Sequence, residues 1–249
     1  MNVDLHGRVA VVTGGSRGIG AAISHRLAAL GAGVVILYRH DDASAEAVVE
    51  AIRASGGSAS ATKANLVHPE EIRRAFFELP GGRVDLLVHA AALGSFKPVT
   101  DLRANQWDLT MNVNARAFHL CALEAARLMP GEGSIVALSS LGATRVVPEY
   151  GAIGISKAAL EATMRYLAIE LGARGINVNA VSAGIVEGTS VRLHPHYESL
   201  RAAAIERTPL RRLATGDDIA HVVAFLCSPY ARWIQGQVIL ADGGMSLVL

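Results

Sequence analysis

The sequence predicts an α/β protein with a single domain: a Rossmann-like, doubly wound parallel sheet with helices on both faces, in three αβα layers. Three observations predict this class. Short runs of β-branched residues alternate with longer helical patterns, a glycine-rich turn follows the first run, and no linker divides the 249 residues. A chain of this length can bury one large core. We therefore expect one domain over residues 1–249.

The expected strands are short and rich in apolar or β-branched residues: 9–13, 34–37, 58–63, 84–89, 134–138, 177–181 and 238–241. The segments between them carry apolar residues at helical spacing: 21–30, 43–55, 69–79, 101–129, 150–171, 197–207 and 217–227. Sheets built by such alternation bind ligands outside the carboxyl ends of their strands, and the motifs described below follow strands.

Composition limits the possible functions. Hydrophobic residues make up 51% and the mean hydropathy is +0.33, yet no uncharged apolar run approaches the ~18 residues that a membrane span needs. The net charge is +1 with no long basic block, which argues against nucleic acid as the main partner. The first residues lack a secretory signal, so a cytoplasmic location is expected. Cys121 and Cys227 lack metal-like spacing and are expected to be packed thiols, so no metal site is predicted.

The segment VAVVTGGSRGIGAAI runs from a strand through a glycine turn into a helix. Gly14, Gly18 and Gly20 stand where backbone must approach a phosphate and where a helix packs on a strand. A pyrophosphate would lie at the helix N-terminus, against free N–H groups. A tight structural turn is the alternative, but its position after the first strand favours nucleotide binding.

The second strand ends in VVILYRHDD, where an acid would be expected for the ribose 2′-hydroxyl of NAD. This chain has Arg39 there, with Arg17 in the glycine loop. Two guanidinium groups favour a 2′-phosphate and thus NADPH. In the alternative interpretation, Arg39 is an ordinary surface residue and Asp41 or Asp42 folds back onto the ribose.

Further motifs follow later strands: Asn114, the Ser139-Ser140 pair, Lys157, NAVSAG and the closing GQVILADGG. Together with TGGSRGIG they resemble the short-chain dehydrogenase/reductase superfamily over essentially the whole chain. Within it, LSSLGATRVVPEYGAIGISKAALEATMRYLAIEL is similar to the enoyl-acyl carrier protein reductases, in which six residues separate a tyrosine from a lysine. The RGIG turn makes the resemblance closest to the NADPH-dependent type III enzymes.

Tyr150 precedes Lys157 by seven residues, and Ile153 stands four before the lysine, where carbonyl-reducing members have their tyrosine. On a helix, both spacings keep the pair on one face, but the longer one moves the tyrosine about 4.5 Å along the axis. Conjugate reduction places hydride on a β-carbon while charge gathers on a more distant oxygen. The longer spacing therefore favours reduction of a C=C bond.

The resemblance implies that Tyr150 hydrogen-bonds the thioester oxygen, and that Lys157 holds the nicotinamide ribose and lowers the pKa of the tyrosine. It also implies a local helix distortion at Asn114 that holds a water linking the lysine to solvent. Ser140 aligns with the catalytic serine of the carbonyl-reducing members, although a backbone-satisfying role for it or for Ser139 is equally compatible.

The resemblance thus assigns catalysis to Tyr150, Lys157, Ser140 and Asn114. It assigns cofactor contacts to Gly14, Ser16, Arg17, Gly18, Ile19, Gly20, Arg39, Asn65, Leu66, Ala91, Lys157, Gly184, Ile185 and Thr189. His89 ends a buried strand, and we expect a structural role for it.

Residues 187–212 are expected to cover the substrate. Their arginines could meet a phosphopantetheine phosphate or an acidic acyl carrier protein, or they could form the solvated face of an amphipathic helix. The two long helical stretches carry more small and apolar residues than one sheet face can hide. Relatives pair them across two-fold axes, so a homotetramer of D2 symmetry is expected.

Three functions remain open. The first is NADPH-dependent reduction of a trans-2-enoyl thioester, carried by CoA or an acyl carrier protein, in fatty-acid or related acyl-chain biosynthesis. The second is carbonyl reduction of a polyketide or other specialised metabolite. The third is NADPH binding without catalysis.

Overall fold

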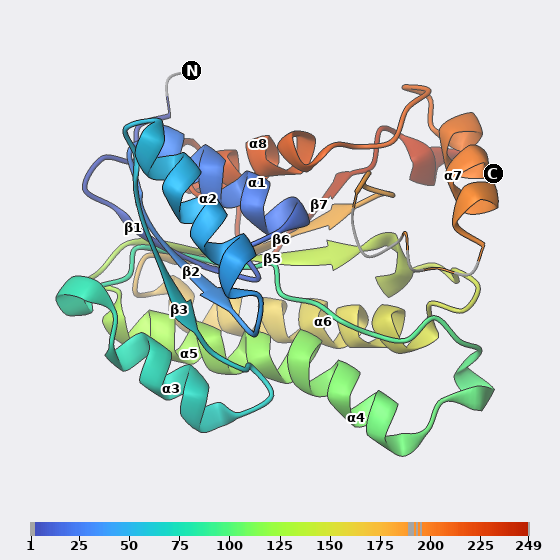
Figure 1. The fold of residues 1–249 in the computed structure, drawn as a ribbon, viewed down its shortest axis with the longest axis horizontal. Coiled ribbons are helices and arrows are strands. Elements are labelled where there is room, and N and C mark those ends of the chain that lie inside the picture. Colours follow the sequence, from blue (N-terminus) through green and yellow to red (C-terminus); the bar gives the residue numbers. More distant parts are fainter. Residues whose placement is uncertain (1–2, 189–191, 193, 195, 249) are drawn as a thin grey trace.

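The structure, a computed structural model, describes residues 3–188, 192, 194 and 196–248. Seven strands form one parallel sheet in the order β3-β2-β1-β4-β5-β6-β7 (Figure 1). Their bounds are β1 Val9–Thr13, β2 Gly33–Tyr38, β3 Ser58–Lys63, β4 Leu86–His89, β5 Gly133–Ser140, β6 Ile176–Ala183 and β7 Val238–Ala241. The strand order reverses at β1: β2 and β3 lie on one side of it and β4 to β7 on the other. This confirms the predicted doubly wound arrangement.

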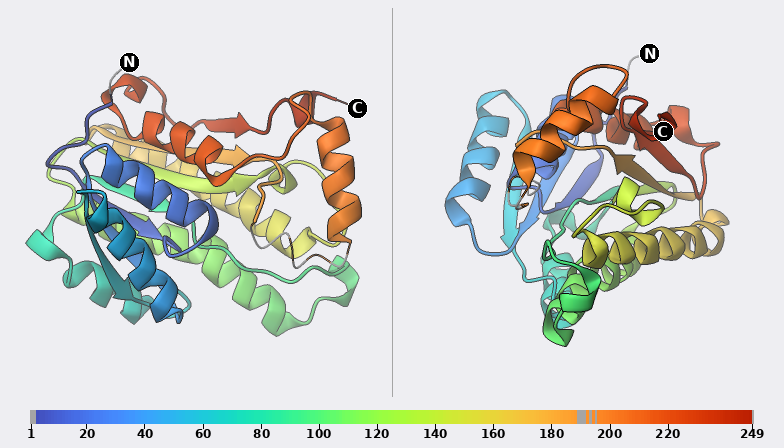
Figure 2. Two further views of the ribbon diagram at one scale, coloured as in Figure 1. Left: turned by 45° about the horizontal axis from the view of Figure 1, so that its top comes forward. Right: turned by 90° about the vertical axis from the view of Figure 1, so that its right-hand side faces the viewer.

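Helices cover both faces of this sheet, giving three layers (Figures 1 and 2). One layer contains α1 Gly18–Ala29, α2 Asp42–Ala54 and α8 Gly216–Leu226. The other contains α3 Pro69–Phe77, α4 Ala104–Met111, α5 Ala117–Leu128 and α6 Gly151–Gly172. Helix α7, Tyr197–Arg207, lies beyond the carboxyl ends of the strands, close to the C-terminal segment (Figure 1).

Two apolar cores lie on the two sides of the sheet, and successive strand residues alternate between them. In β1, Val11 packs toward α3, α5 and α6, while Ala10 and Val12 pack toward α1 and α8. In β5, Ile135 and Val136 divide in the same way. A strand buried on both faces has no polar side, which explains the continuous apolar runs in the sequence.

Some element bounds differ from the predictions. The expected helix 69–79 ends at Phe77, shortly before Pro80, which begins a short 3-10 turn, Pro80–Gly82. The expected stretch 101–129 is interrupted by a π-helical turn, Asn112–Arg116. Tyr150 is the residue before α6, with φ −102° and ψ 7°, and is not part of the helix.

The described part of the chain holds no helix long and apolar enough to cross a membrane. Cys121 and Cys227 are buried free thiols, as expected, and burial raises the pKa of both. Within the same residues, no three His, Cys, Asp or Glu side chains come together as a metal site would require.

Candidate active site

The glycine turn between β1 and α1 is built on close backbone approaches. Gly14 has φ +66° and Gly18 φ +53°, the left-handed region that favours glycine. A Cβ on Gly14 would lie 2.8 Å from Ala91 Cα, and one on Gly20 would lie 2.2 Å from the Gly14 oxygen. The glycines of the turn and the start of α1 therefore form a cradle that fits a pyrophosphate.

The turn is fixed to the end of β4 through Thr13, whose hydroxyl accepts a hydrogen bond from the Ala91 N–H at 3.2 Å. The Thr13 hydroxyl also lies 3.1 Å from His89 Nδ1. His89 is fully buried, and burial, aided by the charge of Lys157, lowers its pKa to about 3. The ring is thus neutral in ordinary buffers, in keeping with the expected structural role.

The two acids after β2 are already engaged. Asp41 caps α2, accepting from Ser44 N at 3.0 Å and Ser44 Oγ at 2.6 Å. Asp42 accepts from Lys63 Nζ at 2.9 and 3.1 Å. The alternative in which one of these carboxylates folds back onto a ribose is therefore not the arrangement of this chain.

Arg17 and Arg39 are both exposed at this end of the sheet. Arg39 Nε donates to the neighbouring His40 ring at 3.0 Å. The charge of Arg17 acts on Asp41, so the arginine lies near the end of β2. These residues fit a 2′-phosphate better than a bare ribose hydroxyl.

The remaining cofactor residues lie along the same edge. Asn65 accepts from Val67 N at 3.2 Å, which leaves its amide NH2 available, and Leu66 and Ser16 are buried. Gly184 follows β6, where its N–H donates to the Ala241 carbonyl at 3.3 Å. Thr189 lies outside the described residues.

Tyr150 is held from several sides. Its hydroxyl hydrogen-bonds Ser140, whose Oγ accepts from Gly142 N at 3.2 Å. A Cβ on Gly142 would lie 2.6 Å from Cδ1 of the tyrosine ring, so glycine is needed for the ring to lie on this turn. The Phe96 ring centroid is 6.1 Å away.

We expected Lys157 to lower the pKa of Tyr150, and for the protein alone this is wrong. Burial raises the pKa of the phenol, and the opposing effect comes from the hydrogen bond with Ser140. The tyrosine is therefore a neutral hydrogen-bond donor.

Lys157 lies buried inside α6, and its Nζ donates to the Leu138 carbonyl at 2.6 Å. Burial lowers the pKa of this lysine to about 8, and the nearby Glu161 opposes the change. Ser139 donates to Glu161 Oε1 at 2.5 Å. The two serines thus have different partners: Ser140 faces the tyrosine, while Ser139 faces α6.

Asn114 lies in the π-helical turn, where the sequence predicted a helix distortion. Its Oδ1 accepts from Leu93 N and its Nδ2 donates to Leu93 O, both at 2.9 Å. Nδ2 also donates to Ser156 Oγ at 2.8 Å. The side chain therefore ties the loop after β4 to α6, next to the reactive residues.

Residues 14–246 match the family model described as Enoyl-(Acyl carrier protein) reductase. The chain is 37% identical to 1-cyclohexenylcarbonyl-CoA reductase of Streptomyces collinus, over 97% of this chain and 88% of the relative. It is 36% identical to versicolorin reductase 1 of Aspergillus parasiticus, over 98% of each chain. The crystal structure of angucycline C-6 ketoreductase LanV with bound NADP superposes with a TM-score of 0.89, at 36% identity over 98% of each chain.

The chain belongs to the short-chain dehydrogenase/reductase superfamily. It is therefore an oxidoreductase.

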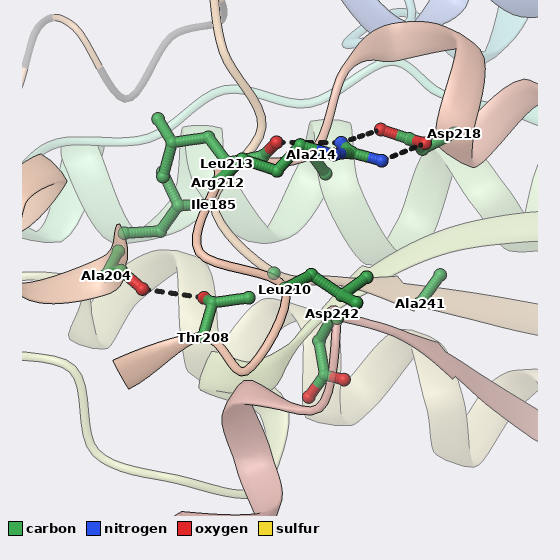
Figure 3. Close-up of a pocket in the computed structure, with 12 residues that line it drawn as sticks. Ile185, Ala204, Thr208, Leu210, Arg212, Leu213, Ala214, Asp218, Ala241 and Asp242 are labelled. Carbon is green, nitrogen blue, oxygen red and sulfur yellow. Dashed lines mark hydrogen bonds and ion pairs between the residues drawn. The ribbon is translucent and has the colours of Figure 1, made fainter. Parts of the chain in front are cut away.

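The short-chain dehydrogenase/reductase fold also leaves a cavity of about 160 Å³ between the ends of β6 and β7 and the segment from α7 to α8. Ile185, Leu210, Leu213 and Ala204 line it, and Thr208 faces it while donating to the Ala204 carbonyl at 2.6 Å (Figure 3). The cavity is mostly apolar and adjoins the predicted nicotinamide contact Ile185.

Three arginines of residues 187–212 have hydrogen-bond partners within the chain. Arg212 forms a two-point ion pair with Asp218 at 2.6 and 2.9 Å, which lowers the pKa of that carboxyl (Figure 3). Arg211 donates to the Glu206 carbonyl and Arg207 to the Val248 carbonyl. This favours the structural interpretation for these three over dedicated phosphate binding.

Sequence reasoning missed two parts of this oxidoreductase site. Glu161 follows Lys157 by four residues, so the helical spacing carried a signal for it. Gly142 carried none, because its contact with the Tyr150 ring depends on how the turn after β5 meets the start of α6.

Proposed function

We propose that this protein catalyses NADPH-dependent reduction of the C=C bond of trans-2-enoyl thioesters, carried by CoA or an acyl carrier protein, in fatty-acid or related acyl-chain biosynthesis. One observation carries the proposal: the half-buried Tyr150 precedes Lys157 by seven residues, and the buried Ile153 fills the position of the usual tyrosine. A Cβ on Gly94 would lie 2.2 Å from Ile153 Cγ1. The aliphatic side chain of Ile153 is therefore packed against Gly94 and fills the space between them.

The cradle formed by Gly14, Gly18 and Gly20 fits the pyrophosphate of NADPH, and Arg17 and Arg39 fit its 2′-phosphate. NADP bound to the related ketoreductase LanV supports the same cofactor here. When bound, NADPH supplies the hydride that adds to the β-carbon of the substrate.

The chain's own residues stabilise the charge that this addition creates. Charge gathers on the thioester oxygen, and the neutral hydroxyl of Tyr150 is a donor suited to that oxygen. Ser140 orients the hydroxyl through its hydrogen bond, and Gly142 supports the ring. Lys157, whose ammonium donates to the Leu138 carbonyl, would hold the nicotinamide ribose.

The cavity beside Ile185 supports an acyl substrate, since Ile185, Leu210 and Leu213 form an aliphatic part of its wall. The relative from Streptomyces collinus supports the reaction class, because its name describes a reductase of an unsaturated acyl-CoA. Ala204, Thr208 and Leu210 line this cavity and belong to the segment 187–212, which we assign to covering the substrate.

Carbonyl reduction is the second candidate. The hydrogen bond between Ser140 and Tyr150 favours it, because a serine and a tyrosine acting together suit an oxygen bonded directly to the hydride-accepting carbon. Versicolorin reductase 1 and the ketoreductase LanV, both named for such substrates, support it too.

The test follows NADPH absorbance with crotonyl-CoA and, in parallel, with acetoacetyl-CoA. Wild type is compared with Tyr150→Phe and with Tyr166→Phe, which changes an exposed tyrosine in α6. Oxidation with crotonyl-CoA that disappears only in Tyr150→Phe supports enoyl reduction. Turnover of acetoacetyl-CoA alone supports the second candidate. If the protein binds NADPH but turns over neither substrate, nor their analogues with longer acyl chains, it is a non-catalytic protein.

We also propose a homotetramer of D2 symmetry in the cytoplasm. Tyr166 and Ile169 on α6 are 73% and 82% exposed, and Leu240 in β7 and Leu247 near the C-terminus are 54% and 84% exposed. Two separate apolar faces fit the two kinds of two-fold contact in such an assembly. Analytical ultracentrifugation at micromolar concentration tests this, and a monomer would contradict it.

A further inference from the structure

Glu161 is a buried carboxylate next to the reactive site. It lies in α6, one turn after Lys157, and only 6% of it is exposed. Its Oε1 accepts from Ser139 Oγ at 2.5 Å, a distance typical of a hydroxyl bound to an ionised carboxylate. Burying such a charge is costly unless an opposite charge compensates it.

Lys157 is the opposite charge. Its ammonium donates to the Leu138 carbonyl at 2.6 Å, and Leu138 directly precedes Ser139 in β5. Two consecutive strand residues therefore hold the ammonium and the carboxylate, which also share one face of α6 at a spacing of four residues. The charge of Glu161 acts on Lys157 in this buried environment.

We propose that Glu161 is a positioning residue for the reaction: held by Ser139, its carboxylate is the counter-charge that keeps Lys157 an ammonium at the Leu138 carbonyl. This inference rests on the proposed function only in giving Lys157 its reactive role. It also gives Ser139 a role distinct from that of Ser140.

The other titratable groups around Lys157 do not replace this carboxylate. Tyr150, at the start of α6, is neutral because burial raises its pKa. His89, at the end of β4, is neutral because burial lowers its pKa. Of these neighbours in the described structure, Glu161 is the one that supports the lysine's charge, and it opposes the fall of the lysine's pKa.

The chain has three lysines, Lys63, Lys97 and Lys157, so NMR of protein labelled with 13C-lysine can follow each one. Lys63→Arg and Lys97→Arg assign the signals. The pH titration of Lys157 is compared between wild type, Glu161→Gln and Glu170→Gln, an exposed glutamate on the same helix. The experiment needs no substrate, so its result is separate from whether enoyl thioesters are reduced.

We expect the Lys157 titration, near pH 8 in wild type, to move about one unit lower in Glu161→Gln and to stay in place in Glu170→Gln. Ser139→Ala should move it in the same direction by less, and this variant tests the proposal if Glu161→Gln does not fold. An unchanged Lys157 titration in Glu161→Gln, or in Ser139→Ala where only that variant folds, would overturn the inference.

Once a substrate is established, the same variant provides a kinetic test. The alkaline limb of the rate profile should move to lower pH in Glu161→Gln, while Glu161→Asp should restore part of the shift. A merely structural role would lower the rate equally at every pH.

Discussion

Ile153 packs directly on Gly94, so closely that a Cβ on the glycine would lie 2.2 Å from Ile153 Cγ1 and 2.8 Å from Cδ1. The loop after β4 therefore approaches α6 at the position where carbonyl-reducing relatives carry their tyrosine. With isoleucine at this position, the phenol of the site comes from Tyr150, which lies one residue before α6.

Because the space beside Gly94 is full, Ile153→Tyr should not transfer the reaction to the four-residue spacing. Overpacking should cost about 1–3 kcal/mol of unfolding free energy. In a Tyr150→Phe background the new tyrosine should restore neither enoyl nor keto reduction. Urea unfolding and NADPH oxidation measure the two effects.

Ile153→Val is the matched control, since it removes one methylene and should cost about 0.5–1.5 kcal/mol with activity kept. The prediction would be contradicted if Ile153→Tyr were as stable as wild type and if the double variant with Tyr150→Phe were active. The contact with Gly94 would then not determine which residue reacts.

Arg39 should determine the choice between NADPH and NADH. Removing one guanidinium from a phosphate site costs roughly 1.5–3 kcal/mol, so Arg39→Ala should bind NADPH about 10 to 100 times more weakly. NADH affinity should change little, because NADH has no 2′-phosphate. Fluorescence titration with both nucleotides measures the ratio.

Arg165→Ala, an exposed arginine in the opposite helix layer, should leave both affinities unchanged. If Arg39→Ala weakened NADPH and NADH equally, the arginine would not be recognising the 2′-phosphate.

Local signals in the sequence were enough for the fold. The alternation of strands and helices and the glycine turn each depend on residues close together in the chain, whereas the helix distortion at Asn114 was implied by the resemblance to the superfamily. The engagement of Asp42 by Lys63 was not predictable, because it depends on how α2 lies against β3. The pairing of Ser139 with Glu161 joins β5 to α6 and needed the packed structure as well.

Asn114 should contribute to stability as well as to catalysis. Asn114→Ala would leave the N–H and carbonyl of Leu93 without their side-chain partner, at a cost of about 1–3 kcal/mol for each buried group that stays unpaired. Chemical denaturation measures the loss. Asn112→Ala, in the same π-helical turn but only half-buried, should cost clearly less, and equal losses would show that the Leu93 contacts are not what Asn114 supplies.

Lys157 should make the stability of the protein rise with pH between about 8 and 10.5. Burial lowers its pKa from 10.5 to about 8, so over this interval the unfolded chain binds a proton that the folded protein has released. Unfolding then takes up protons, and stability increases as pH rises through the folded pKa until the unfolded pKa is passed. The full gain is on the order of 3 kcal/mol.

Other groups titrate in the same interval, so the quantity to measure is the difference in unfolding free energy between wild type and Lys157→Met at pH 7, 8, 9 and 10. Methionine has similar length and no charge, so it avoids the cost of burying an ammonium. Wild type should gain stability relative to the variant as the pH rises from 8 to 10, because wild type is then folded with a neutral lysine. A constant difference across the series would mean that Lys157 releases its proton at the same pH in the folded and unfolded chains, and that burial does not shift it.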